Sequence, residues 1–214
     1  DRTEKNRKGM RDMKKWNYLL AAVTLALSVL LTGCGGQQQE EEQVSQASPE
    51  DLHHVKIKVK DYGTISVELD GQAAPLTVEN FINLAKDGFY DGLTFHRVIK
   101  GFMIQGGDPN GDGTGGSEKT VKGEFAKNGV ENPLKHTRGT ISMARSSDKD
   151  SASSQFFIVQ ETSAHLDKEY AAFGHVTEGM EIVDKICDDV KTEDSNGSVA
   201  PENQPVIESI EVVD

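Results

Sequence analysis

The stretch FHRVIKGFMIQGGD, residues 95–108, combines two short apolar runs with one Arg, one Gln and a pair of adjacent glycines. The runs at 94–98 and 103–107 are typical of two short strands joined by a turn. The stretch contains no Ser or Cys nucleophile and no pair of carboxylates for acid–base catalysis. It can therefore supply apolar contact and hydrogen bonding, but nothing obvious that makes or breaks a covalent bond.

The sequence around this stretch indicates further short strands and two helices. Apolar and polar residues alternate over 55–59 and 65–69, with a turn at 61–63, which predicts a β-hairpin. Apolar residues recur every three or four positions over 75–88 and 179–190, which predicts two amphipathic helices. Further strands are expected at 139–144, 155–159, 171–176 and 206–213. Many short strands with Gly-rich turns favour a closed, mostly antiparallel β-barrel.

The first part of the chain resembles a secretory signal. Seven Lys and Arg residues precede an apolar run over 19–31, which is shorter than the roughly 20 residues of a membrane-spanning helix. LTGC, residues 31–34, resembles the bacterial lipobox, in which the Cys becomes the first mature residue and receives lipid. We expect residues 1–33 to be a signal peptide and Cys34 to be lipidated. A buried or disulfide-bonded Cys34 and an uncleaved anchor are the alternatives, and both still place the domain outside the cytoplasm.

Residues 34–52 are expected to form a flexible acidic linker to one folded domain, residues 53–214. The linker is too polar to bury enough apolar area to offset the entropy of ordering. Residues 1–33 contain 7 of the 23 Lys and Arg residues and 3 of the 35 Asp and Glu residues, so the rest of the chain has a net charge near −16. This charge argues against nucleic acid as a partner, because phosphate binding depends on Lys and Arg.

We expect no metal site and no cofactor. Cys187 is the only Cys besides Cys34, which excludes a disulfide framework and a Cys metal cluster, and it is predicted to be a core residue on a helix face. The loop DPNGDGTGGSEK, residues 108–119, begins like an EF-hand, but Lys119 stands where that site needs a bidentate Glu. We interpret it as a Gly-rich surface loop.

Four blocks of the sequence resemble successive signatures of the cyclophilins. They are FHRVIKGFMIQGGD (95–108), GTISMARS (139–146), SSQFFIV (153–159) and HLDKEYAAFGHV (165–176). The resemblance runs in order from about residue 55 to residue 213. It implies a closed eight-stranded antiparallel β-barrel capped by two α-helices, and the activity of a peptidyl-prolyl cis–trans isomerase.

This reaction accounts for the residue types in the first block. Rotation about an X–Pro bond is slowed by amide resonance, with a barrier of ~18–20 kcal/mol, and it breaks no covalent bond. The catalyst has to hold the proline ring and to favour the twisted amide, in which the prolyl nitrogen can accept a hydrogen bond. A guanidinium suits this donor role because it cannot lose its proton.

Three residues of the first block are expected to be catalytic. By resemblance, Arg97 is the donor to the prolyl nitrogen, and Gln105 holds Arg97 or the substrate backbone. Phe102 forms part of the apolar pocket for the proline ring. Phe95 and His96, which flank the donor, are interpreted as structural.

The resemblance also implies a set of substrate-binding residues, most of which lie downstream of the first block. They are Met103, Ala144, Arg145, Phe157, His165, Leu166 and Tyr170. Taken singly, the apolar members would more often be ordinary core residues, as Phe156 and Phe173 are expected to be. Together with Arg97 and Gln105 at the family's spacing, they are predicted to form the proline pocket and its rim.

Three positions depart from the best-known pattern of the family. His165 stands where many members have a Trp, Tyr170 where many have a His, and Arg145 where Asn is common. The Trp supports binding of the cyclic peptide cyclosporin in this family, so we expect weak inhibition by cyclosporin with turnover largely retained. Arg145 is expected to alter substrate choice near the groove.

Two functions are compatible with these residues. The first is an active isomerase, lipid-anchored outside a bacterial membrane, that speeds the folding of exported proteins. The second is a proline-peptide-binding or chaperone module with incidental turnover. The pairing of Arg97 with Gln105 favours the first. Expected partners are proline-containing polypeptides and, through lipid on Cys34, the membrane, and we expect a monomer.

Overall fold

The computed structural model of the chain describes residues 51–214. Within that range the strands are β1 (Leu52–Val59), β2 (Gly63–Asp70), β3 (Thr94–Ile99), β4 (Met103–Asp108), β5 (Thr140–Met143), β6 (Phe156–Val159), β7 (Ala172–Glu178) and β8 (Ile207–Val212). The helices are α2 (Pro75–Lys86) and α3 (Met180–Asp189), with short 3₁₀ turns at η2 (Ala126–Asn128), η3 (Ala164–Leu166) and η4 (Pro201–Asn203). None of the helices in residues 51–214 is long and apolar enough to cross a membrane.

Every strand and helix expected from the sequence within this range is present. β1 begins at Leu52, one residue before the predicted domain boundary at residue 53. The predicted signal peptide, Cys34 and nearly all of the predicted linker lie outside the described residues.

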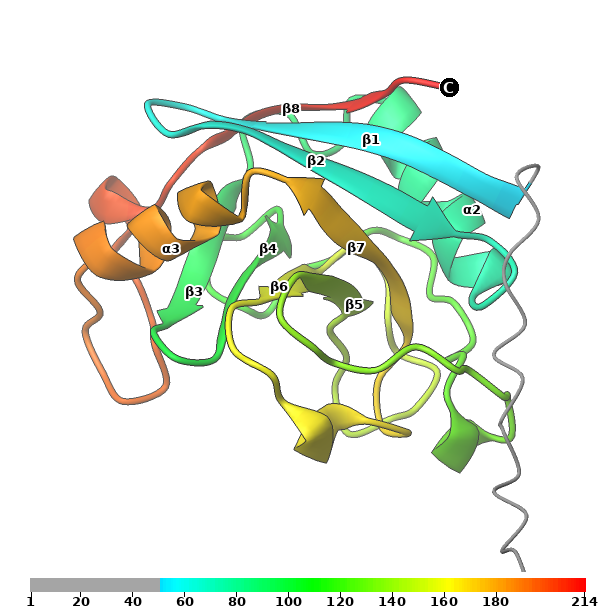
Figure 1. The fold of residues 1–214 in the computed structure, drawn as a ribbon. Helices are drawn as coiled ribbons and strands as arrows, with labels where there is room; N and C mark the ends of the chain where they lie inside the picture. The colour runs from blue at the N-terminus through cyan, green and yellow to red at the C-terminus, as the bar shows by residue number, and fades with distance from the viewer. Residues whose placement is uncertain (1–50) are drawn as a thin grey trace, which may run out of the picture. The chain divides into compact units, whose positions relative to one another are not determined.

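The strands form one antiparallel sheet in the order β3-β4-β6-β5-β7-β2-β1-β8. Figure 1 shows that the sheet curls. Helix α3 lies beside the turn of the β1–β2 hairpin, and α2 lies towards the opposite end of the same two strands. Antiparallel neighbours along the whole order agree with the predicted fold class. Short turns connect only β1 to β2 and β3 to β4, while longer segments connect the other successive strands.

The sheet is open, so the expectation of a closed barrel is wrong. Among the described residues, the start of β3 meets the start of β8 at an isolated bridge between Thr94 and Val206, flanked by hydrogen bonds such as that from Ile207 N–H to Leu93 O at 2.8 Å, and no ladder continues from it. The free edge of β3 is instead taken by an incoming loop: Val98 N–H donates to Gly197 O at 2.8 Å, and Val199 N–H donates to His96 O at 3.0 Å. Because this loop satisfies the backbone groups of β3, a β3–β8 ladder has no free partners along most of its length.

The apolar residues of the alternating pattern face the core, as the sequence predicts. In β1 the side chains of Val55, Ile57 and Val59 are buried, while the lysines between them are exposed. Aromatic rings fill the interior: Phe81 of α2 packs 5.4 Å from Phe156, edge to face, with both rings fully buried. Such contacts add to the burial of apolar area that stabilises the fold.

Helix α2 begins at a buried carboxylate. Pro75 occupies the first turn, where its missing N–H costs nothing. Glu124 Oε1 accepts a hydrogen bond from Leu76 N–H at 3.1 Å, and its Oε2 accepts one from Thr77 N–H at 2.8 Å. A negative charge at this position also complements the helix dipole. Glu124 thus replaces the side-chain cap that Ala74, the residue before the helix, cannot provide.

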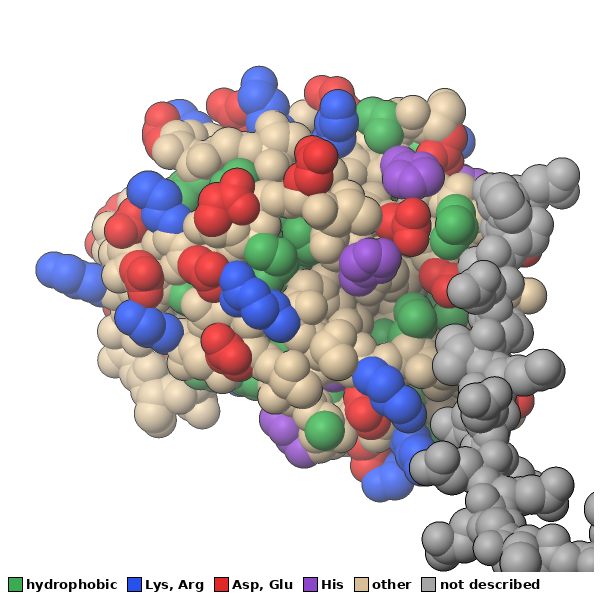
Figure 2. Space-filling view, in the orientation of Figure 1, with side chains coloured by type: hydrophobic (Ala, Val, Ile, Leu, Met, Phe, Trp, Pro, Cys, Tyr) green, Lys and Arg blue, Asp and Glu red, His purple; other side chains and the backbone are tan. Residues whose placement is uncertain are grey.

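The surface of the domain carries both signs of charge. On the face drawn in Figure 2, the acidic and basic side chains of the described residues are interspersed and form no continuous basic patch. Phosphate binding uses clustered Lys and Arg, and that nucleic acid is not a partner stays a prediction.

Candidate active site

One row of residues crosses four neighbouring strands. Arg97 of β3 pairs with Gln105 of β4, Gln105 pairs with Phe157 of β6, and Phe157 pairs with Ser142 of β5. Directly opposed residues project from the same side of a sheet. The register therefore places the predicted donor, its polar partner and an aromatic pocket residue side by side, although they are up to 60 positions apart in the sequence.

The sheet separates this site from the core. Phe156 and Ile158 of β6 belong to the main hydrophobic core, whereas Phe157 belongs to a second apolar cluster. Successive side chains of a strand point to opposite faces, so adjacent residues serve different functions. The second cluster consists of Met103, Phe157, Val159 and Leu166, with Ile99, Phe102, Ala144 and Tyr170 packed against it.

A register shift in β3 aims Arg97 at this cluster. Phe95 pairs with Gly106 and Arg97 pairs with Gln105, so His96 has no partner in the ladder. Phe95 and His96 are both buried, as the structural interpretation of these residues requires, while Arg97 is half-buried. Such bulges re-aim side chains next to functional sites.

The Arg97 guanidinium is held on two sides. Its Nε donates to Asn196 O at 2.7 Å, and its Nη1 donates to Gln105 Oε1 at 3.1 Å. Burial lowers the pKa of Arg97, whereas Tyr170 and Asp194 act in the opposite direction. A guanidinium remains protonated at neutral pH even so. Two of its five N–H groups are thus engaged, and the cation is fixed in the wall of the site.

Gln105 is itself oriented by a second amide. Its Nε2 donates to Gln155 Oε1 at 2.8 Å, and Gln155 Nε2 donates to Gly113 O at 3.1 Å and Gly115 O at 2.7 Å. Because each amide donates through nitrogen, its oxygen is left to accept. This series of hydrogen bonds therefore orients Gln105 so that its side-chain oxygen faces Arg97.

These side chains surround a pocket of about 260 Å³. It is lined by Arg97, Phe102, Met103, Gln105, Ala144, Arg145, Phe157, Leu166 and Tyr170. Nine of the ten catalytic and substrate-binding residues predicted from the sequence therefore meet in one cavity. The tenth, His165, does not line it but lies against Phe102, with ring centroids 5.5 Å apart. The roles assigned to these residues remain predictions.

The family described as "Cyclophilin type peptidyl-prolyl cis-trans isomerase/CLD" matches residues 54–212 of the chain. The chain belongs to the cyclophilins. It is accordingly a peptidyl-prolyl cis–trans isomerase, as the names of its relatives also indicate.

Bacterial peptidyl-prolyl cis-trans isomerases are among the most similar relatives. Peptidyl-prolyl cis-trans isomerase B of Bacillus subtilis is 47% identical over 144 residues, which cover 67% of this chain and 92% of that protein. A peptidyl-prolyl cis-trans isomerase of Helicobacter pylori is 50% identical over 126 residues, covering 58% of this chain and 75% of the relative. The similarity thus extends through most of the described domain.

A solved cyclophilin has the same fold. The enzyme of Cryptosporidium parvum, whose crystal structure was determined in the presence of the dipeptide Ala-Pro, is 31% identical with a TM-score of 0.66. The match covers 75% of this chain and 99% of that chain. The match therefore spans nearly the whole of that chain.

Two of the departures from the cyclophilin pattern contact each other. The Arg145 guanidinium lies 4.7 Å from the centroid of the Tyr170 ring and 5.1 Å from that of Phe125. Its Nε and Nη2 donate to Glu169 O at 3.1 and 2.9 Å. A cation between two aromatic faces is a favourable arrangement. Arg145 thus fixes Tyr170 at the rim of the pocket through its side chain, a contact that the sequence did not predict.

A buried histidine supports the pocket from below. His136 stacks on Phe157 with centroids 6.0 Å apart, and its side chain is 1% exposed. Its Nδ1 lies 3.1 Å from Asp167 Oδ1, and its Nε2 lies 3.0 Å from Ser142 Oγ. Burial lowers the pKa of His136, although Asp167 acts in the opposite direction. His136 and Ser142 of this Asp–His–Ser series are buried beneath the pocket residue Phe157, and Asp167 is half-buried, so we assign the series a structural role.

Sequence reasoning missed three contributors to the site. Gln155 could have been found, because it lies two positions before Phe157 and shares its face of the strand. His136 carried no local signal, since a lone His is most often structural. Asn196 acts through its backbone carbonyl, which no side-chain pattern reveals.

The Gly-rich loop that begins at Asp108 is ordered by hydrogen bonds. Asp108 Oδ1 accepts from Asn110 N–H at 2.8 Å, and its Oδ2 accepts from Gly113 N–H at 2.6 Å. Among residues 51–214, no group of three or more His, Cys, Asp or Glu side chains is arranged to hold a metal ion. Asp108 therefore shapes the loop whose carbonyls orient Gln155.

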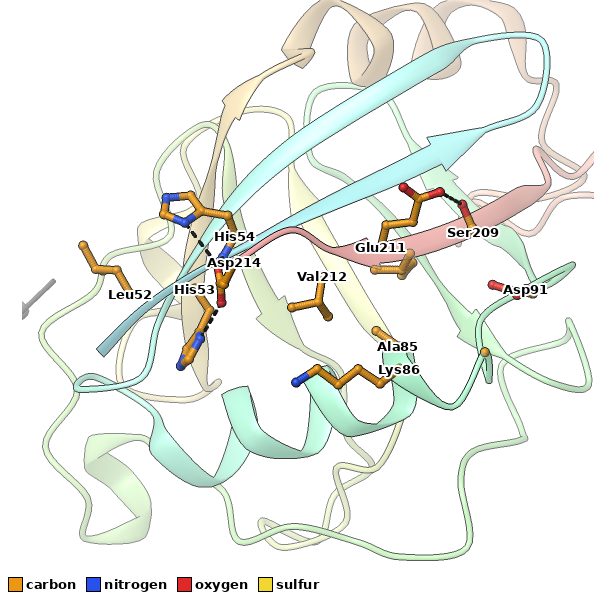
Figure 3. A pocket seen from close by; sticks show the side chains of 12 residues that line it. Leu52, His53, His54, Ala85, Lys86, Asp91, Ser209, Glu211, Val212 and Asp214 are labelled. Atoms are coloured by element: carbon orange, nitrogen blue, oxygen red, sulfur yellow. Dashed lines mark hydrogen bonds and ion pairs between the residues drawn. The ribbon is translucent and has the colours of Figure 1, made fainter. Parts of the chain in front are cut away.

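A larger groove, of about 1090 Å³, lies between α2 and β8. Figure 3 shows His53 and His54 pointing to Asp214 at one end of it. Among the described residues that line this groove there is no Phe, Tyr or Trp. It therefore offers a proline ring no aromatic surface, and the smaller pocket around Arg97 is the candidate site.

Proposed function

We propose that Arg97 accelerates X–Pro rotation by donating a hydrogen bond to the prolyl nitrogen of the twisted amide. The planar amide delocalises its nitrogen lone pair into the carbonyl, and rotation restores that lone pair. A donor at the nitrogen then stabilises the twisted state more than the planar one, as catalysis requires. The observation that carries this proposal is the Arg97 guanidinium, fixed by Gln105 and Asn196 in the wall of an apolar pocket.

The apolar residues have a separate role in the proposal. Phe102, Met103 and Phe157 hold the proline ring, while the preceding carbonyl turns. Lowering the barrier by about 7 kcal/mol corresponds to roughly 10⁵-fold acceleration. Fixed donors of this kind are effective because they need no reorganisation during the reaction.

Replacement of Arg97 tests the mechanism. In a chymotrypsin-coupled or NMR-exchange proline assay, Arg97→Ala is expected to lower kcat by roughly 10²–10³-fold, the usual loss for a single charge-stabilising donor. Arg97→Lys should recover little, because an ammonium cannot reproduce the two directed hydrogen bonds. Unchanged turnover in Arg97→Ala would show that another group supplies the donor.

We further propose that the substrates are proline-containing segments of exported proteins, and that the enzyme is anchored by lipid on Cys34. The lipobox-like LTGC supports the anchor, and slow isomerisation, at tens of seconds uncatalysed, is a plausible limit in folding after export. Mass analysis of the native protein is expected to find a diacylglycerol-modified Cys34 at its N-terminus. Cys34→Ala should abolish the modification, whereas Cys187→Ala should retain it. An intact N-terminal segment on the native protein would refute the cleavage.

The chaperone alternative differs in turnover. A module that only binds proline peptides would retain peptide affinity while raising the isomerisation rate little above background. The Arg97–Gln105 pair supports turnover instead, since binding of a proline ring alone needs no oriented cation. Wild-type protein that binds a proline peptide without accelerating its exchange would favour the alternative.

A further inference from the structure

The loop between Thr192 and Val199 forms part of the wall on which Arg97 rests. Asn196 in this loop contributes the carbonyl that accepts from Arg97 Nε at 2.7 Å. An isolated bridge pairs Thr192 with Val199 and closes the loop at its base. A second isolated β-bridge pairs Arg97 with Ser198. The orientation of one side of the guanidinium is therefore set by the conformation of this loop.

Gly197 lets the loop approach β3 closely. Its φ is +84°, and a Cβ at this position would lie 2.4 Å from Val98 O. Any side chain would thus both strain the backbone and push the loop off the strand. The close approach permits the hydrogen bond from Val98 N–H to Gly197 O at 2.8 Å. This contact fixes the base of the turn, but not the peptide that carries the Asn196 carbonyl.

Gly197 N–H, which belongs to that peptide, donates to the backbone O of Asp194 at 3.2 Å. The side chain of Asp194 holds the residues on either side of the peptide. Its Oδ1 accepts from Asn196 N–H at 2.9 Å and from Ser198 N–H at 3.1 Å, and its Oδ2 accepts from Ser198 Oγ at 3.1 Å. Hydrogen bonds from Ser198 and Asn196 lower the pKa of Asp194, so it is ionised at neutral pH. One carboxylate thus holds both sides of the turn.

The turn has little packing behind it. A cavity of about 210 Å³ lies on its other side, lined by loop residues that include Asp194 and Gly197, by the end of β3, and by Cys187 and Val190 at the end of α3. A loop over a hollow is not held in shape by close-packed side chains. Its internal hydrogen bonds must do so, and those that flank Asn196 end on Asp194.

We infer that Asp194 is a positioning residue for the isomerase: it holds the Asp194–Ser198 turn so that the Asn196 carbonyl orients Arg97 for donation. The inference rests on the donor role proposed for Arg97. Asp194 does not touch the proline pocket, so it acts only through the turn and through its charge. The two contributions are separable, since Asn at this position keeps an oxygen acceptor and loses the charge.

The test compares Asp194→Ala and Asp194→Asn with a matched control, Asp70→Ala. Asp70 Oδ1 also accepts from two backbone N–H groups, those of Gln72 and Ala73, but at the end of β2 away from the site. Asp194→Ala is expected to lower kcat/KM for a short X–Pro peptide about tenfold, with the loss in kcat, because misplacement of a catalytic group slows the chemical step. Asp194→Asn should retain at least half of the activity, and Asp70→Ala all of it.

A second readout follows Arg97 directly. In the wild type the Arg97 Nε–H resonance is expected to exchange slowly with solvent because it is bonded to Asn196 O. In Asp194→Ala it should exchange faster, and in Asp70→Ala it should not change. Wild-type turnover and an unchanged Nε–H resonance in Asp194→Ala would overturn the inference, as would a loss of stability alone that Asp70→Ala matches.

The two readouts separate this inference from the proposed mechanism. If Arg97→Ala keeps its turnover while Asp194→Ala still frees the Nε–H group, the donor role is wrong and the positioning of the guanidinium stands. If Arg97→Ala is inactive and Asp194→Ala resembles wild type in both readouts, the donor role stands and the positioning role is wrong.

Discussion

Arg97 and Gln105 face each other across the β3–β4 ladder, and the Arg97 Nη1 group donates to Gln105 Oε1 at 3.1 Å. A hydrogen bond that involves a charged group contributes about 1.5–3 kcal/mol. Gln105→Ala is therefore expected to lower kcat/KM by roughly tenfold to a hundredfold in the proline assay.

A double variant decides whether Gln105 acts through Arg97. If it does, Arg97→Ala/Gln105→Ala should be no slower than Arg97→Ala alone, because residues that act as a unit are not additive. A further loss in the double variant, equal to that of Gln105→Ala alone, would mean that Gln105 contacts the substrate independently.

The Arg145 side chain is expected to stabilise the rim of the pocket. It is 12% exposed and lies between the rings of Tyr170 and Phe125. Arg145→Ala should lower the free energy of unfolding by about 1–3 kcal/mol, from the lost cation–π contact and two hydrogen bonds to Glu169 O. It should also raise KM, because Tyr170 loses its support. Urea denaturation and steady-state assays measure the two effects.

Arg138 provides the control for this prediction. Its side chain is 40% exposed, makes a bidentate ion pair with Asp184 on the surface and donates to Gln160 O at 2.9 Å. Exposed ion pairs contribute about 0–1 kcal/mol, so Arg138→Ala should destabilise the domain less than Arg145→Ala and leave KM unchanged. Equal destabilisation by the two variants would contradict the role assigned to the ring contacts.

Cyclosporin is expected to inhibit the enzyme weakly. His165 packs against Phe102 with centroids 5.5 Å apart, but its imidazole is smaller than the indole that many cyclophilins carry at this position. The smaller ring buries less apolar area against a cyclic peptide. His165→Trp should therefore strengthen inhibition while changing turnover of a short substrate little. Nanomolar inhibition of the wild type in the proline assay would contradict this prediction.

The elements could be predicted because they follow from local patterns, and the pocket residues because the sequence resembles the cyclophilins. Alternating residues located β1 and β2, and the motif around Arg97 carried the family's spacing. The open edge could not be predicted in this way. Whether β3 meets β8 depends on where the loop ending at Val199 lies, and that loop binds β3 through backbone groups that its side chains do not indicate.

Local sequence patterns also do not reveal the tertiary contacts that orient the side chains of the site. Arg145 and Tyr170 appeared as two separate departures from the family pattern, 25 positions apart in the sequence. Their contact arises from tertiary structure, since the strand that ends at Met143 and the segment before β7 lie side by side. Gln155 and His136 likewise act on catalytic or pocket residues from other elements.

The stability of the domain is expected to fall as pH decreases below about 6.5. Burial lowers the pKa of both His96 and His136 from the ordinary value of 6.5. Carboxylates oppose the shift without reversing it: Asp108 and Asp112 act on His96, and Asp167 acts on His136. Between the folded pKa and 6.5 the unfolded chain binds protons that the folded protein does not.

Stability therefore rises with pH across this window, and the stabilisation is fully present above it. Each histidine contributes a slope of at most about 1.4 kcal/mol per pH unit. Urea denaturation between pH 7 and pH 5 should give this slope, and His136→Gln should reduce it, since Gln cannot titrate. The NMR titration of the His136 ring protons provides the direct check: a midpoint above 6.5 would mean that Asp167 outweighs burial, and the predicted sign would be reversed.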